Sequence, residues 1–169
     1  MKNTRLTKTK LLCIVVLWCI SSFTTHAQLD YKMAGPFKVV ARDGEFRASK
    51  GGSERDMKAA FDLANIYSNK KASSTADREK AKAKALDIIN AYSSNLERLD
   101  GHDAPLCAIQ CFDMVRAMTI LRDFKTPQWD AMVRNAMLPT IDKFEADSPY
   151  ANGNWGAIVN RLRMAIGIY

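Results

Sequence analysis

The chain has few of the residues on which metal and redox chemistry usually depend. Of its 169 residues, four are cysteines and two are histidines. Two of these cysteines and one histidine lie in the first 27 residues, so the remainder keeps only Cys107, Cys111 and His102. No cluster has zinc-ligand spacing, so we expect no metal site. Two cysteines four apart on a helix are poorly oriented for a disulfide, and buried thiols are expected instead.

An apolar run long enough to span a membrane is also lacking. The longest, Leu11–Ile20, has ten residues, follows the basic residues of 1–10 and precedes a Thr-x-Ala sequence ending at Ala27. A permanent transmembrane helix needs about 20 residues, whereas this pattern is typical of a signal peptide. We therefore predict a leader over 1–27, export to the periplasm or medium, and no stable membrane insertion.

A strong charge of one sign is missing once the leader is set aside. The net charge of the whole chain is +7, and removing the four basic residues of 1–27 lowers it to about +3. The charged run 77–84 is most simply a solvated helix face. So weak an excess permits an anionic partner, but we expect no nucleic-acid binding.

Strand-like alternation is absent, and helical spacing dominates. Residues 28–52 are predicted to be irregular, with Ser53 capping the first helix. A second and a third helix follow the breaks at 70–75 and 100–103. A fourth begins at Thr126-Pro127, and Pro139 predicts a kink within it. A fifth begins at about Asn154. The apolar stripe of the third helix is too wide for a lightly packed surface helix. Short turns predict an all-α fold of antiparallel helical hairpins.

The turn 148–156 (SPYANGNWG) carries two amides and an aromatic ring to the start of the last helix. Such a turn suits recognition of an acidic or polyhydroxylated ligand. The alternative is that Asn152 or Asn154 caps the helix while Trp155 fills the core.

The order of several motifs resembles the alginate lyases of the helical-toroid type. The similar segments are 46–53 (FRASKGGS), 101–108 (GHDAPLCA), 147–150 (DSPY), 152–156 (NGNWG) and 164–167 (MAIG), within roughly 35–169. The resemblance implies that 53–169 is the N-terminal part of an (α/α) toroid domain. It also implies β-elimination of a uronate polysaccharide such as alginate, with no metal or other cofactor.

Site roles follow from the resemblance by position. Asn154 matches the asparagine that neutralises the uronate carboxylate. His102, in another turn, is the candidate to substitute as base. Lys50 matches a basic residue of the substrate-contacting loop, and Arg47 lies near it in the sequence. The remaining candidate substrate contacts are Asn152, Trp155 and Tyr150.

The sequence departs from the family at Trp155, where many of these lyases have histidine. The tyrosine and arginine that the family implies would lie beyond Tyr169, and the last helix has an unpaired apolar stripe. We therefore expect a truncated, inactive fragment. The alternative function is glycan binding by a helical protein without catalysis, and a purely structural scaffold is a third possibility.

Overall fold

The computed structural model describes residues 28–41, 49–71, 73–99, 104–148 and 152–169, with the backbone alone over 104–110. Contacts divide the chain into two compact units, Met1–Tyr31 and Lys32–Tyr169. The elements named below belong to the second unit. The predicted leader, 1–27, lies outside the described residues.

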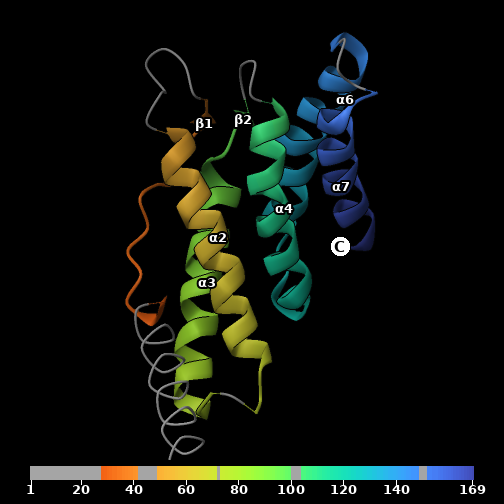
Figure 1. Cartoon of the computed structure of the whole chain (residues 1–169). Coiled ribbons are helices and arrows are strands. Elements are labelled where there is room, and N and C mark those ends of the chain that lie inside the picture. The colour runs from red at the N-terminus through yellow and green to blue at the C-terminus, as the bar shows by residue number, and fades with distance from the viewer. Residues whose placement is uncertain (1–27, 42–48, 72, 100–103, 149–151) are drawn as a thin grey trace, which may run out of the picture. The chain divides into compact units, whose positions relative to one another are not determined.

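The second unit is mostly helical (Figure 1), which confirms the all-α class predicted from the sequence. Two turns of other helix types, η2 (3₁₀) and η3 (π), and two very short strands complete it. In chain order the elements are β1 (Val39–Val40), α2 (Ser49–Ser68), α3 (Thr75–Asn95), β2 (Arg98–Leu99), α4 (Ala104–Ile120), η2 (Arg122–Phe124), α5 (Pro127–Met132), η3 (Val133–Met137), α6 (Leu138–Asp147) and α7 (Asn154–Ile168).

The helices run in two opposite directions. Helices α2, α4 and α7 are parallel, and α4 packs against both of the others (Figure 1). Helix α3 runs the other way and packs against α2 and α5, while α6 contacts α4 and α7. Successive helices are therefore antiparallel when α5, η3 and α6 are taken as one continuous arm, as short connections favour, and α2, α4 and α7 begin at the same end.

The two strands join the segment before α2 to the segment after α3. They pair in parallel, Val39 with Arg98 and Val40 with Leu99, and the Glu97 N–H donates to the Lys38 carbonyl over 2.8 Å. Two residues are too few for an alternating pattern, so these strands were not predicted from the sequence. The pairing closes the α2–α3 hairpin at its open end.

Helix α2 starts at Ser49, four residues before the predicted cap, so the prediction that residues 49–52 are irregular was wrong. The buried Ser49 hydroxyl accepts from the Ala41 N–H and donates to the Ala41 carbonyl. Gly52 lies against the Phe37 ring, where a Cβ would approach ring carbons to 2.6 Å. Tertiary packing thus extends the helix through a Gly-Gly pair that is unfavourable by propensity.

The predicted interruption near Pro139 is present as the π-helical turn η3 between α5 and α6. Proline cannot donate to the preceding turn and its ring crowds it. The chain accommodates this with wider i→i+5 spacing, and Pro139 then sits in the first turn of α6. The Thr140 hydroxyl donates to the Ala136 carbonyl over 2.9 Å.

The core lies between the two sets of helices. Trp129 is fully buried, and its indole N–H donates to Asn90 Oδ1 over 2.7 Å, which ties α5 to α3. The other large, fully buried side chains include Tyr92, Met57, Leu63, Ile89, Met114, Met118, Leu121, Met132, Met137 and Ile141.

Candidate functional site

The sequence-predicted residues that the structure describes gather at the end where α2, α4 and α7 begin (Figure 1). Lys50 is the second residue of α2 and Asn154 is the first of α7. Neighbouring helix axes lie about 8–10 Å apart, so α2 and α7, on either side of α4, are separated by about two such spacings. A ligand touching both ends must be extended. The partly positive ends of three helices favour an anion here.

Neither asparagine of the 152–156 turn caps α7. The N-cap is Gly153, at φ −100° and ψ −161°, and no side chain hydrogen-bonds to the first turn. Asn152 and Asn154 are both exposed. The helix-cap alternative is therefore wrong for both, and their amide groups face solvent.

Trp155 follows Asn154 and is half-buried, whereas the next residue, Gly156, is buried. The fully buried face of α7 is formed by Gly156, Val159, Leu162 and Ala165. The Trp155 side chain is therefore partly buried and partly exposed. In the chain it directly follows the exposed Asn154.

Lys50 is half-buried in the first turn of α2, and its carbonyl accepts from the Ser53 hydroxyl over 2.9 Å. The bonds between Ser49 and Ala41 hold this turn in place. Three other predicted site residues, Arg47, His102 and Tyr150, lie outside the described residues.

A buried carboxylate supports the α2 side of this end. Asp56 is fully buried and accepts from the N–H groups of Ala34 and Gly35, over 2.8 and 2.9 Å, and from the Tyr92 hydroxyl. A buried charge is tolerated when its lone pairs are satisfied in this way. The network joins the segment before β1 to α2 and α3.

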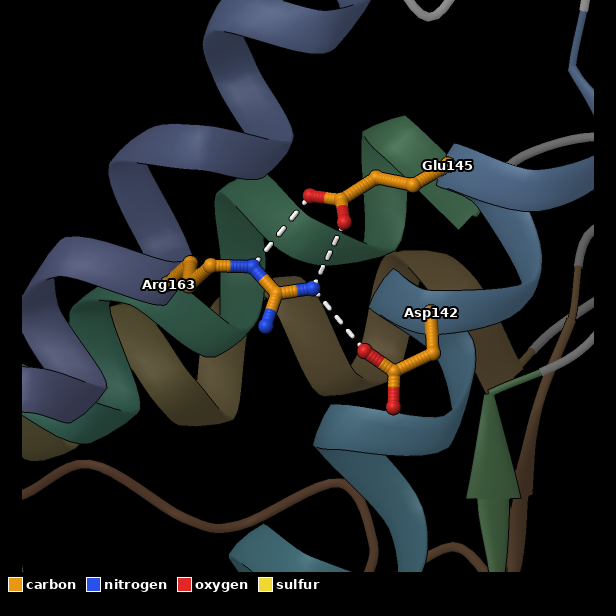
Figure 2. A network of polar contacts seen from close by, with 3 residues as sticks. All are labelled: Asp142, Glu145 and Arg163. Carbon is orange, nitrogen blue, oxygen red and sulfur yellow. Dashed lines mark hydrogen bonds and ion pairs between the residues drawn. The ribbon is translucent and has the colours of Figure 1, made fainter.

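An arginine on α7 fixes that helix to α6 (Figure 2). Arg163 Nε and one terminal nitrogen contact both oxygens of Glu145, over 3.2 and 2.7 Å. The same terminal nitrogen donates to Asp142 over 2.9 Å. Hydrogen bonds, first to Asp142 and then to Glu145, raise the pKa of Arg163. These contacts add a partly exposed polar link between α6 and α7, whereas α7 packs mainly against α4.

A groove that the sequence reading did not identify lies along α2, α4 and α7. Its volume is about 750 Å³, and it is mostly apolar. The lining residues are Phe61, Asn65, Phe112, Arg116, Thr119, Ile120, Ala157, Asn160, Arg161, Met164, Ala165 and Ile168. The wide apolar stripe of α4 is the sequence feature that indicates this groove, because one side of that helix faces the core and another faces the groove.

Two guanidinium groups lie flat on rings in this groove. Arg116 lies over Phe61, with its central carbon 3.7 Å from the ring centroid. Arg161 lies over Phe112 at the same distance. Stacking of this kind fixes the plane of a guanidinium and leaves its N–H edge available.

The described residues offer anion recognition rather than a proton-transfer pair. Neither histidine of the chain is among them, and within the part that the structure describes no three His, Cys, Asp or Glu residues gather as metal ligands. Cys111 is fully buried in α4. Exposed amides and a lysine at one end can hold a carboxylate, but they do not move protons by themselves.

Comparison with known proteins found no matching family model, no similar curated protein and no similar solved structure. No helix within the described residues is both long and apolar enough to cross a bilayer. The function is therefore argued from the site.

Proposed function

We propose that this chain is an exported, polysaccharide lyase-like protein that acts on a uronate-containing polysaccharide such as alginate. The observation that carries the proposal is the solvent-facing amide of Asn154 at the first residue of α7. It lies at the same end of the unit as Lys50, where three parallel helices begin. Amides and positive helix ends are suited to neutralising carboxylates.

The helix arrangement also supports a toroid. In an (α/α) toroid, one set of parallel helices is backed by a second set of opposite direction. Helices α2, α4 and α7, with α3, α5 and α6 running the other way, follow this order. We propose that they form part of such a domain.

In the proposed β-elimination, Asn154 donates to the C5 carboxylate and makes the adjacent proton more acidic. His102 is the proposed base that removes this proton, and the glycosidic oxygen departs with a proton from an acid. Lys50 and Arg47 would hold carboxylates of neighbouring sugars, with Asn152, Trp155 and Tyr150 as further contacts. A lysine suits this role because it is a flexible point charge.

The test is digestion of a polyuronate panel by a full-length version of the protein, followed by ultraviolet absorbance of the unsaturated product. Asn154→Ala should remove the signal, whereas the control Asn135→Ala, an exposed amide on η3, should not. Absence of product from every polyuronate contradicts the lyase assignment. Sequencing of the secreted protein from its N-terminus tests export, since cleavage should expose Gln28.

A second candidate is glycan binding without catalysis. It is favoured by the half-buried Trp155 beside the exposed Asn154, at a position where the lyases have histidine. An aromatic face can stack on a sugar ring. Binding of a uronate oligomer without cleavage, weakened by Trp155→Ala, would support this candidate. A calorimetric titration without heat would exclude both functions for the oligomer used.

A further inference from the structure

The groove along α2, α4 and α7 holds one cation more than its acidic neighbours neutralise. Lys58 pairs with Asp62 over 2.8 Å, both on α2. Arg116 pairs with Asp113 over 3.6 Å, both on α4. Arg161, on α7, belongs to none of the ion pairs found within the described residues. The sum over these five side chains is therefore one positive charge, and Arg161 is the cation without an ion-pair contact, although it lies near enough to Asp113 to act on that carboxyl.

The geometry of Arg161 leaves a binding edge open. The central carbon of its guanidinium lies 3.7 Å from the centroid of the Phe112 ring, so the ring covers one side of it, and within the described residues no ion pair uses its N–H groups. A planar guanidinium matches the two oxygens of a carboxylate. The residue itself is exposed, so an anion from solvent can reach it.

The rest of the groove is mostly apolar, with Asn65, Thr119, Asn160 and Arg116 as its polar side chains, and it is partly uncovered. Met164 and Ile168 are 69% and 74% exposed, which is unusual for side chains of this size. They share the groove with Phe112 and Ile120, beyond the guanidinium. Burying such surface stabilises a complex by about 25 cal/mol for each Å² removed from water. A volume of about 750 Å³ is within the usual range for small-molecule sites.

We propose that this groove binds a single-tailed amphiphilic monocarboxylate, with its carboxylate on Arg161 and its tail along Phe112, Ile120, Met164 and Ile168. The single surplus charge matches a monoanion. A membrane surface is a poorer fit, because stable attachment needs several basic residues or a second anchor. A polyuronate is also a poorer fit, since it is hydroxylated along its whole length and a mostly apolar lining leaves many of these hydroxyls without partners. The proposal does not depend on the polysaccharide function.

The test is isothermal titration of the full chain with dodecanoate below its micelle concentration. Three further probes separate the contributions of the charge and of the tail to binding. Acetate lacks the tail, dodecyltrimethylammonium reverses the charge, and a mannuronate oligomer replaces the tail by sugars. Dodecanoate should bind, and the other three should bind at least tenfold more weakly or not at all.

Two variants locate the site. Arg161→Met keeps the apolar stem and should weaken dodecanoate binding at least tenfold, whereas Arg134→Met, an exposed arginine on η3, should not. Ala157→Phe fills the groove while keeping its charges and should also weaken binding. Circular dichroism checks that each variant is folded.

Three results would overturn the proposal. The first is equal affinity for dodecyltrimethylammonium, which would remove the role of the charge. The second is unchanged dodecanoate binding in both groove variants. The third is a mannuronate oligomer that binds in place of dodecanoate and is lost in Arg161→Met, which would make the groove a sugar site. Lyase activity on polyuronate is measured separately, so failure here leaves that function standing.

Discussion

Tyr92, on α3, donates its hydroxyl hydrogen to Oδ2 of Asp56, on α2, over 2.7 Å, and both residues are fully buried. The same carboxylate accepts the N–H groups of Ala34 and Gly35. One acidic side chain thus links three segments that are far apart in the sequence.

Tyr92→Phe should lower the free energy of unfolding by about 1.5–3 kcal/mol, the usual range for a hydrogen bond to a charged group. The expected change is measured by urea denaturation monitored by circular dichroism. Tyr67→Phe, on a half-buried tyrosine, is the control. A loss below about 0.5 kcal/mol would mean that this hydrogen bond contributes little to the stability of the fold.

The two glycines at the start of α2 should respond to alanine in opposite ways. At Gly52 a Cβ would approach the Phe37 ring to 2.6 Å, so Gly52→Ala should destabilise the fold by about 1–3 kcal/mol. At Gly51 the nearest atom, on Arg55, is 3.8 Å away, so Gly51→Ala should stabilise by up to about 1 kcal/mol through helix propensity. Paired melting curves measure both. Changes of the same sign would contradict the packing described here.

Loss of the α6–α7 contact should loosen α7. Arg163→Gln removes the bonds to Asp142 and Glu145, and we expect a cost of about 1 kcal/mol at low salt, because exposed ion pairs are weak individually. Amide exchange over 154–168 should become faster. The effect should shrink in 1 M salt, where exposed charges are screened. Arg122→Gln, on the exposed turn η2, should leave exchange in α7 unchanged.

Asp113 should make the fold less stable as pH rises. Burial raises its pKa above the ordinary 3.8, and Asp62 adds to this, while Arg116, Lys58 and Arg161 oppose it. The folded chain therefore holds this proton at pH values where the unfolded chain has released it, so the contribution to stability falls as pH rises from 3.8 through the raised pKa.

Asp113→Asn should remove that loss. The melting temperature of the variant minus that of the parent should be larger at pH 7 than at pH 3.5. The exposed Asp123→Asn serves as the control. A difference between variant and parent that is the same at both pH values would contradict the raised pKa.

Local patterns predicted much of the fold. The start of α7 near Asn154, the start of α5 after Thr126-Pro127 and the disturbance before Pro139 were all predicted from short-range rules. These features depend on residues close in sequence, so helical spacing and proline chemistry are enough to find them.

Features that depend on distant residues were missed. The start of α2 is set by Ala41 and Phe37, which no helical pattern of residues 49–52 includes. Periodicity shows that a helix has an apolar face but not which helix covers it. For this reason the groove lined by Phe61 and Phe112 was not predicted.

The candidate site was predicted in part. Asn154, Asn152 and Lys50 do share one end of the helices, but that depends on the directions of α2 and α7, which turn lengths alone left open. The solvent-facing state of Asn154 was also undetermined, because an asparagine at that position is equally able to cap a helix.

Each backbone hydrogen bond of the π-helical turn η3 spans one residue more than a hydrogen bond of an α-helix. Each residue of an α-helix rotates the next by about 100°. Deleting one residue within 133–137 would therefore turn α6 by about that angle and carry Asp142 and Glu145 away from Arg163. The extra residue therefore decides which side of α6 meets α7, and with it the contacts of Arg163 with Asp142 and Glu145.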